Sequence, residues 1–358
     1  MTRPSLPPLA EYEALLPKLW ESGMLTNGGP YVRQLEAELA AYLPARHLVA
    51  VANGTLALQI ALRAIGGDHG SVITTPFTYA ATTTALVWQG FTPRFVDIDR
   101  ETFNLDPTLV PDHLARDVVG ILPVHVFGNP AGGRDVADVA RESGRWCIFD
   151  SAHCIGVRTS GRSVFDLGDA STLSLHATKS YHSFEGGAIS AARPAVAARV
   201  ARLRSFGFDA DGDVPEPGIN AKLTEPAAAM GLVNLRHLEE WIRIREERVR
   251  LYRELLASVD DVTFQRVEAR RPSVTYMPIL LPDLRTRERV VRALDREGIR
   301  TRRYFFPLTS GFSFLPRSSR RRCPVAEEIA NRVLCLPLYH ELPEAEVRRV
   351  VATLRSAL

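Results

Sequence analysis

The sequence predicts an α/β fold, with a large, mainly parallel sheet domain followed by a smaller α/β domain. Short apolar segments typical of buried strands alternate with amphipathic segments of ten or more residues. This order favours parallel strands joined by crossover helices. The chain has 358 residues, of which 46% are hydrophobic, so it can bury a large core. We expect the large domain, with an N-terminal helix, over residues 1–240 and the small domain over residues 241–358.

The first half of the chain shows this alternation most clearly. Amphipathic periodicity predicts helices at Leu9–Gly23 and Val32–Tyr42, separated by the Gly-rich turn Thr26–Pro30. Strands are expected at Leu48–Val51, Ser71–Thr75, Arg94–Val96, Ile121–Val124 and Arg145–Phe149, and helices at Thr55–Ile65, Tyr79–Gln89 and Arg134–Ser143. Strands this short and apolar fit a sheet that is buried on both faces.

The second half is organised around one long helix. Residues 225–256 read as a continuous helix, which we expect to link the two domains, and strand and helix patterns alternate again after residue 258. The segment Arg317–Arg322 is a basic loop. We interpret it as a solvated loop, with binding of a diphosphate as the alternative.

Composition argues against several functional classes. The net charge of +3 is small and acidic residues accompany the arginines, so we expect no nucleic-acid partner. The chain begins without an apolar signal region and has no apolar run that could span a bilayer, so we expect a cytoplasmic protein without a membrane partner. The four cysteines match no zinc spacing, so no metal site is expected.

Lysine is nearly absent from the chain, which directs attention to the lysines that remain. Only Lys18, Lys179 and Lys222 occur, against dozens of arginines. An arginine is always charged, whereas a lysine amine can be deprotonated and act as a nucleophile. Lys179 lies downstream of a strand that ends at Asp150. A lysine that can bind the aldehyde and an aspartate that can pair with the pyridine nitrogen together favour a pyridoxal phosphate (PLP) site. Lys222, just before a helix, is the less favoured alternative.

Four further positions could complete such a site. The Gly54–Thr55 turn opens a helix and could bind a phosphate, although a simple helix cap is the alternative. Tyr79 follows a strand and could stack on the ring, or it could be a core tyrosine. Ser174 could reach the phosphate from the loop before the lysine. His153 could reach the 3-hydroxyl side of the ring, or it could be a packed or capping histidine. For Asp150, the alternative is a structural ion pair.

These residues lie in blocks that together resemble the sugar aminotransferases of the DegT/DnrJ/EryC1/StrS family, within fold type I of the PLP enzymes. The blocks are Asn53-Gly-Thr-Leu-Ala-Leu58, Pro76-Phe-Thr-Tyr-Ala-Ala-Thr82, Phe95-Val-Asp-Ile-Asp99, Pro123-Val-His-Val-Phe-Gly-Asn-Pro130, Asp150-Ser-Ala-His153, Ser174-Leu-His-Ala-Thr-Lys179, Glu185-Gly-Gly-Ala188, Ala227-Ala-Ala-Met-Gly-Leu-Val-Asn-Leu235, Arg302-Arg-Tyr-Phe-Phe-Pro307 and Pro324-Val-Ala-Glu327. They are spread over nearly the whole chain.

The resemblance implies a homodimer with active sites at the subunit interface. Lys179 would hold PLP covalently and Asp150 would pair with the ring nitrogen. Gly54, Thr55 and Ser174 would bind the phosphate, and Asn220 would reach the phosphate of the partner subunit's site. Tyr79 would stack on the ring. Candidates for the sugar pocket are Tyr181, His182, Lys222 and Tyr304.

The sequence around Lys179 and the segment Thr26–Pro30 are similar to those of the subgroup that aminates C4 of nucleotide-linked 4-keto-6-deoxyhexoses. The expected substrates are therefore a nucleotide sugar, with dTDP as the nucleotide, and L-glutamate, which leaves as 2-oxoglutarate. Alternatives are a 3-aminotransferase or keto-cyclitol aminotransferase of the same family, or a non-catalytic PLP-binding regulatory protein. Lysine at position 179 disfavours the dehydratase branch, which has histidine there. The arginine bias suggests a high-GC genome and antibiotic biosynthesis.

Overall fold

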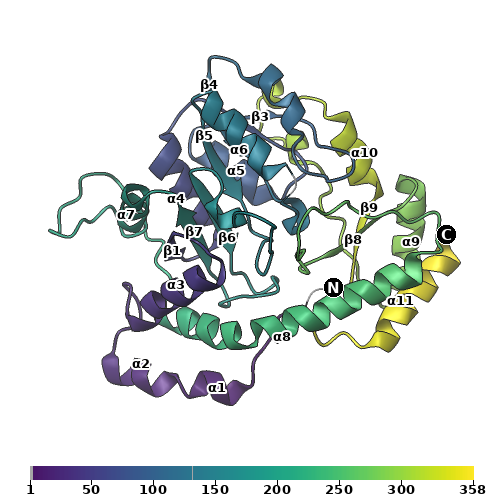
Figure 1. The fold of residues 1–358 in the computed structure, drawn as a ribbon, viewed down its shortest axis with the longest axis horizontal. Helices are drawn as coiled ribbons and strands as arrows, with labels where there is room; N and C mark the ends of the chain where they lie inside the picture. Colours follow the sequence, from purple (N-terminus) through teal and green to yellow (C-terminus); the bar gives the residue numbers. More distant parts are fainter. Residues whose placement is uncertain (1–2, 131) are drawn as a thin grey trace.

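The centre of the molecule is a seven-stranded sheet, seen in a computed structural model that describes residues 3–130 and 132–358 (Figure 1). The strand order is β1-β7-β6-β5-β4-β2-β3. The strands are β1 (His47–Val51), β2 (Ser71–Thr74), β3 (Thr92–Phe95), β4 (Val118–Leu122), β5 (Trp146–Asp150), β6 (Ala170–Ser174) and β7 (Gly187–Ala191). Every neighbouring pair is parallel except the two that contain β7, which confirms the prediction of a large, mainly parallel sheet.

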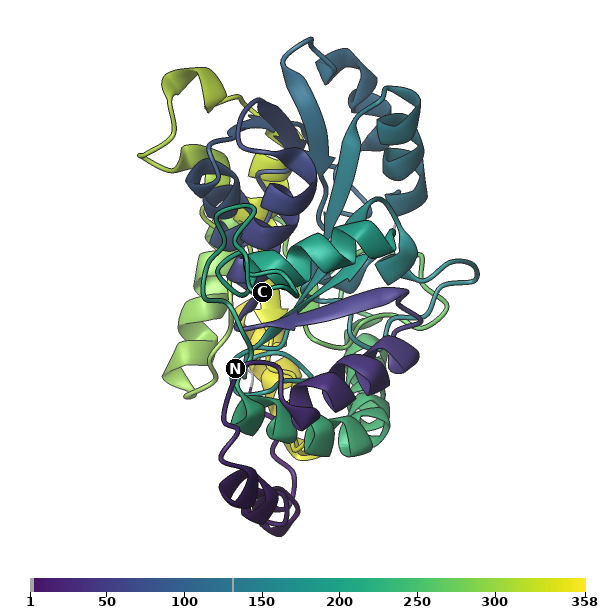
Figure 2. The ribbon, with the colours of Figure 1, turned by 90° about the vertical axis from the view of Figure 1, so that its left-hand side faces the viewer.

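Helices cover both faces of this sheet, as the two perpendicular views show (Figures 1 and 2). The helices are α1 (Leu9–Glu13), α2 (Leu16–Ser22), α3 (Pro30–Tyr42), α4 (Gly54–Gly66), α5 (Ala80–Trp88), α6 (Gly133–Glu142), α7 (Pro194–Leu203), α8 (Glu225–Leu256), α9 (Leu284–Arg296), α10 (Pro324–Arg332) and α11 (Glu344–Ala357). Successive strand residues alternate between the faces: Val72 packs in the core under α4 and α7, and Ile73 in the core under α6. The strands are apolar on both sides for this reason.

One helix of the first 190 residues differs from the sequence-based prediction, and one strand departs from the parallel arrangement of the others. The helix expected over Leu9–Gly23 is broken into α1 and α2, because Pro17 lies in the first turn of α2 and has no N–H to continue a helix. The strand β7 runs antiparallel to β1 and β6, because residues 175–186 between β6 and β7 form a loop rather than a crossover helix. That loop carries Lys179.

The long helix α8 connects the sheet to the C-terminal part of the chain, as expected. It packs against α3 near its start and against α11 further on (Figure 1). The C-terminal part contains a two-stranded antiparallel sheet of β8 (Met277–Leu280) and β9 (Val333–Leu336) with α9, α10 and α11 around it. The boundary expected between residues 240 and 241 falls inside α8. No helix in the described ranges is long and apolar enough to cross a membrane.

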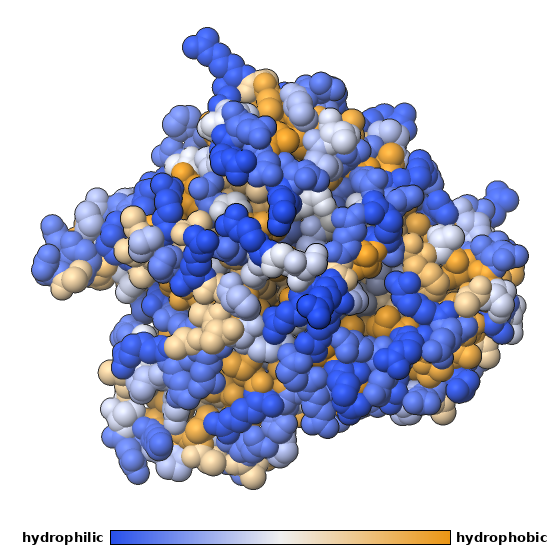
Figure 3. Space-filling view, in the orientation of Figure 1, coloured by the Kyte–Doolittle hydropathy of each residue, from blue (hydrophilic) through white to orange (hydrophobic). Residues whose placement is uncertain are grey.

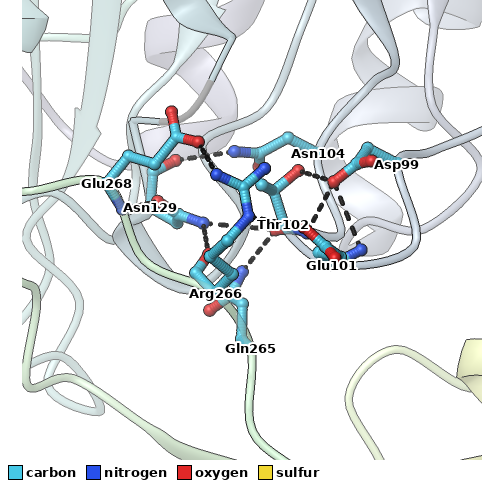
Figure 4. A network of polar contacts seen from close by, with 8 residues as sticks. All are labelled: Asp99, Glu101, Thr102, Asn104, Asn129, Gln265, Arg266 and Glu268. Carbon is cyan, nitrogen blue, oxygen red and sulfur yellow. Dashed lines mark hydrogen bonds and ion pairs between the residues drawn. The ribbon is translucent and has the colours of Figure 1, made fainter.

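A polar network fastens the segment after α8 to the large sheet (Figure 4). The Gln265 amide donates to the Thr102 carbonyl (2.6 Å), and the Asn129 amide donates to the Arg266 carbonyl (2.8 Å). The Arg266 guanidinium pairs with Glu101 (2.7 Å) and also with Glu268. These contacts fix the start of the segment that continues to residues 273–276, beneath Lys179.

Candidate active site

The predicted site residues meet at the carboxyl ends of β5 and β6. Asp150 is the last residue of β5, Ser174 is the last residue of β6, and Lys179 lies on the loop that follows. The amino end of α4, beginning at Gly54, lies against Ser174. Ligands of open α/β sheets bind at this edge, where helix N-termini and strand ends converge.

Asp150 is a buried carboxylate that has no cationic side chain of the described residues in hydrogen-bond contact. It is 5% exposed, and its two oxygens accept hydrogen bonds from the Thr82 hydroxyl (2.8 Å) and the Ala152 amide (3.1 Å). Burial raises the pKa of Asp150 above its usual value, although Thr82, Ala152 and the charge of Lys179 oppose the rise. A structural ion pair, the alternative role, is therefore not what the structure shows. A cationic ring nitrogen held beside it would favour the ionised carboxylate.

Lys179 carries an amine that is less basic than an ordinary lysine. Burial lowers the pKa of its amine to about 8, with Asp150 acting in the opposite direction. An amine with this pKa is about one-tenth neutral at pH 7, far more than an ordinary lysine. Its Nζ lies 5.8 Å from the centre of the Tyr276 ring. The loop is held in shape by a hydrogen bond from the Lys179 amide to the His176 carbonyl (2.9 Å).

The joint between β6 and α4 forms an anion cradle. The Asn53 side chain caps α4 by accepting from the Leu56 amide (2.9 Å), and Ala57 N donates to the Asn53 carbonyl. No hydrogen bond between described residues uses the Gly54 or Thr55 amides, so both N–H groups are available at the positive end of a 13-residue helix. The Ser174 hydroxyl lies beside them, and Thr55 is exposed. This arrangement goes beyond a simple cap and fits a phosphate.

The Gly54→Ala variant tests the cradle. A Cβ at Gly54 would lie 2.9 Å from Ser174 Cβ and 3.3 Å from Ser174 Cα, so helix and strand would have to separate. We expect the dissociation constant for PLP to rise by about tenfold, about 1.4 kcal/mol, in a fluorescence titration. Gly311→Ala is the matched control, because a Cβ there meets nothing within 4 Å. Equal affinity in both variants would contradict the cradle.

His153 closes the far side of the site. It is buried, its ring stacks on Phe305 (centroids 6.0 Å apart), and it meets Tyr276 edge-on at 5.0 Å. Burial and the charge of Lys179 hold the pKa of His153 well below its usual value, so the imidazole is neutral. Its buried Nδ1 has no hydrogen-bond partner among the described residues. His153 is thus a packed histidine with one polar atom still available to a ligand.

An aromatic row lines the mouth of the site. Tyr79 is 56% exposed, so it is not the core tyrosine that was its alternative. Its ring meets Tyr304 edge-on at 6.4 Å, and Tyr304 meets Tyr276 at 5.5 Å. The structure therefore brings the predicted residues Tyr79 and Tyr304 together. The sequence analysis missed Tyr276, since an aromatic before a strand of the second domain has no motif that marks it.

Two predicted sugar contacts, Tyr181 and His182, are buried in this chain. Tyr181 is 0% exposed, and its hydroxyl donates to the Gly231 carbonyl in α8 (3.0 Å). His182 is 1% exposed; its Nε2 pairs with the Ser5 carbonyl (2.8 Å), and its Nδ1 accepts from the Phe184 amide (3.1 Å). Both side chains have their polar atoms occupied inside the protein. Their contacts hold the Lys179 loop against α8 and the N-terminal segment.

Asn220 and Lys222 lie away from the Lys179 cluster in the contacts of this chain. Asn220 is exposed and bridges to Ser205. Lys222 Nζ lies 4.5 Å from the Phe206 ring centre, and the residue lines a hollow of about 200 Å³ with Arg204. Neither contacts the Lys179 cluster, so a role for Asn220 requires a second subunit.

A histidine behind the site makes folding sensitive to acid. His125 is 2% exposed and stacks on Phe149 at 4.8 Å, and burial lowers its pKa to about 4. Its folded pKa lies below the unfolded value of 6.5, so this contribution to stability is present above pH 6.5 and lost as the pH falls toward 4. The full loss is about 3 kcal/mol.

We expect the free energy of unfolding, measured by urea titration from pH 7 to pH 4, to fall less steeply in His125→Leu than in the wild type. An unchanged slope in His125→Leu would show that His125 is protonated in the folded protein.

Comparison with known proteins agrees with this geometry. Residues 10–355 match the DegT/DnrJ/EryC1/StrS aminotransferase family. The chain belongs to this family. The dTDP-4-amino-4,6-dideoxy-D-glucose transaminase of Escherichia coli is 36% identical over 361 residues, covering 99% of this chain and 97% of the relative. The protein is therefore an aminotransferase of this family.

Two solved structures extend the agreement. DesI, solved in the presence of its TDP-sugar product, superimposes with a TM-score of 0.93 at 37% identity, covering 99% of this chain and 91% of DesI. The aminotransferase TlmJ from Streptoalloteichus hindustanus has a TM-score of 0.92 at 26% identity, covering 99% and 97%. The chain therefore has the fold of the PLP-dependent aminotransferases, and the expected fold class is confirmed.

Proposed function

We propose that this aminotransferase carries out PLP-dependent transamination of a nucleotide-linked 4-keto-6-deoxyhexose, with dTDP as the nucleotide and L-glutamate as the donor. The observation that carries the proposal is that a desolvated amine, Lys179, and a buried carboxylate, Asp150, lie at the same sheet edge as an anion cradle. The substrate class follows from the similarity to the E. coli transaminase and to DesI with its TDP-sugar product.

The residues present fit PLP on three counts. The free Gly54 and Thr55 amides and the Ser174 hydroxyl suit its phosphate. Asp150 suits a protonated ring nitrogen, because it is a buried carboxylate that accepts hydrogen bonds from two neutral donors, Thr82 and Ala152. The unpartnered Nδ1 of His153 suits the ring hydroxyl. Exposed Tyr79 would cover one face of the ring.

The reaction then depends on proton transfers by this chain's own residues. When bound, PLP supplies a conjugated ring that accepts the electron pair left behind when a proton leaves the α-carbon. The neutral Lys179 amine takes that proton and returns it to the neighbouring carbon over a short distance, which a pKa of about 8 permits near neutral pH. Asp150 keeps the proton on the ring nitrogen. In the second half-reaction, with the amino group carried by the cofactor after release of 2-oxoglutarate, Lys179 would move the protons in the opposite direction for the keto sugar.

We also propose a homodimer in which Asn220 reaches the partner's phosphate site. Apolar side chains are exposed on α1, α2 and the turn that follows α2, and on the loop after α7; they are Leu9, Trp20, Met24, Leu25, Phe206, Phe208, Val214 and Ile219. Figure 3 shows apolar surface at the lower left, where α1 and α2 lie. Such patches mark protein–protein contacts. We further propose a cytoplasmic location and a division into domains of residues 1–240 and 241–358.

The test is the visible spectrum of PLP-reconstituted protein before and after addition of L-glutamate. We expect the yellow lysine-bound form to bleach and to recover when a dTDP-linked 4-keto-6-deoxyhexose is added. NMR of the product distinguishes amination at C4 from amination at C3, the alternative within the family. Yellow protein that glutamate never bleaches would contradict the donor, and protein that never turns yellow would contradict the cofactor site.

A further inference from the structure

Arg245, in the middle of α8, is a fully buried cation. It is 0% exposed, and burial lowers its pKa to about 10, so it keeps its charge at neutral pH. Among the described residues, Arg245 forms no ion pair with a carboxylate; the ionisable groups around it are Tyr276, His182 and His340. A buried charge without a partner is costly, so a specific use for the guanidinium is expected.

The guanidinium joins three segments that are far apart in the sequence. It donates to the Ser5 hydroxyl (3.2 Å), the Leu338 carbonyl (3.4 Å) and the Val274 carbonyl (3.5 Å). Its buried Nε has no hydrogen-bond partner in the part of the chain that the structure describes. A planar fork of donors can serve several oxygens at once, which a lysine ammonium in the same place could not do with the same geometry.

Val274 lies in residues 273–276, a segment next to Lys179 and its loop that we call the floor. On one side of it, the Ser273 hydroxyl donates to the His153 carbonyl (2.7 Å). On the other side, the Thr275 hydroxyl contacts the Ser180 hydroxyl (3.1 Å), next to Lys179. The next residue is Tyr276, whose ring lies against the Lys179 amine. A shift of Val274 would therefore move this floor relative to the amine.

Ser5 connects Arg245 to the loop that carries Lys179. The Ser5 carbonyl accepts from His182 Nε2 (2.8 Å), and the same imidazole accepts from the Phe184 amide (3.1 Å) at its Nδ1. Asn234 of α8 donates to the His182 carbonyl (2.8 Å). Arg245 thus contacts the floor directly and the loop through one buried serine.

We propose that Arg245 is a positioning residue that holds the Lys179 loop and the 273–276 floor together as one unit, and so keeps water away from the reacting amine. This inference rests on the proposed role of Lys179. It concerns no contact with substrate or cofactor, since Arg245 acts through Val274, Ser5 and His182.

The experiment follows the Lys179 amine itself. The chain has only three lysines, so lysine-specific ¹⁵N labelling of the cofactor-free protein gives few Nζ signals, and Lys179→Ala identifies the one from Lys179. We expect its pKa to rise from about 8 by at least about half a unit in Arg245→Gln, because water reaches a loosened amine. Arg245→Lys keeps the charge but loses the planar set of N–H donors, and we expect the Lys179 pKa to rise in this variant as well.

The matched control is Arg243→Gln, an exposed arginine on the same helix that pairs with Glu247. It should leave the Lys179 pKa unchanged. A rise in Arg245→Gln but not in Arg245→Lys would show an effect of charge alone and overturn the positioning role. If the Lys179 pKa rises in neither variant, the positioning role is overturned as well, whatever the change in melting temperature. Should Arg245→Gln fail to fold, Ser5→Ala, which removes one of the three contacts, provides the same measurement.

A second measurement uses the reconstituted enzyme. With a displaced amine, kcat for Arg245→Lys should fall by about tenfold or more while KM for glutamate changes little, because misplacement affects the chemical step. If wild-type protein binds PLP but does not react with glutamate, the proposed donor fails while the amine titration still tests Arg245. The two failures are therefore distinguishable.

Discussion

Replacing Lys179 with alanine should abolish transamination, with a fall in kcat of at least about 10⁴-fold. The variant loses the amine that attaches the cofactor and also the base that moves the α-proton. No other lysine can substitute, because Lys222 lies against Phe206 and Lys18 is an exposed residue of α2. The measurement is single-turnover loss of the yellow colour with glutamate, followed by assay of the amino-sugar product.

Lys18→Ala is the matched control, since it removes one of the three lysines from an exposed position. It should turn over at the wild-type rate. The phosphate cradle is intact in Lys179→Ala, so PLP should still bind without covalent attachment, and it should be lost on dialysis. Turnover at the wild-type rate in Lys179→Ala would refute the assignment of Lys179.

The Asp150→Asn variant should retain PLP but lose about 10²- to 10³-fold in kcat. An asparagine fits the same space beside Thr82 and Ala152, but it has no charge to keep the ring nitrogen protonated. Without that proton, the ring is a poorer acceptor for the electron pair of the α-carbon. Cofactor content is measured by absorbance after gel filtration, and kcat by the coupled half-reactions.

Asp106→Asn provides the control for Asp150→Asn. Asp106 caps a short turn between β3 and β4 by accepting from the Thr108 amide, and an asparagine can do the same. Normal kcat is expected there. If Asp150→Asn kept full activity, a neutral ring nitrogen would suffice and the proposed role of Asp150 would be wrong. If the Asp150→Asn variant lost PLP altogether, the main role of the carboxylate would be to bind the cofactor.

Much of the fold and the centre of the site could be predicted from local sequence. Strand β5 is a short apolar run that ends at Asp150, and α4 begins at a glycine after an asparagine cap; both are signals within a few residues. Lys179 stood out because lysine is nearly absent from the chain. Helix α8 was predictable over its whole length, since its residues fit one continuous periodic pattern.

Other residues depended on contacts between distant segments. Tyr181 and His182 are two and three positions after Lys179, yet they point into the core, and only their contacts with Gly231 and Ser5 reveal this. Tyr276 reaches the Lys179 amine from nearly one hundred residues away. No local pattern encodes such a meeting, because it results from how α8 places the second domain against the sheet.

The sequence by itself therefore determined the family, the kind of sheet, and the residues that occupy strand ends and helix starts, because turn chemistry and apolar periodicity are local properties. The tertiary structure alone decided which side chains around Lys179 are buried, how far the pKa of its amine falls, and which segments support it. Burial and electrostatics depend on all the atoms near a group, and most of those atoms come from distant parts of the chain.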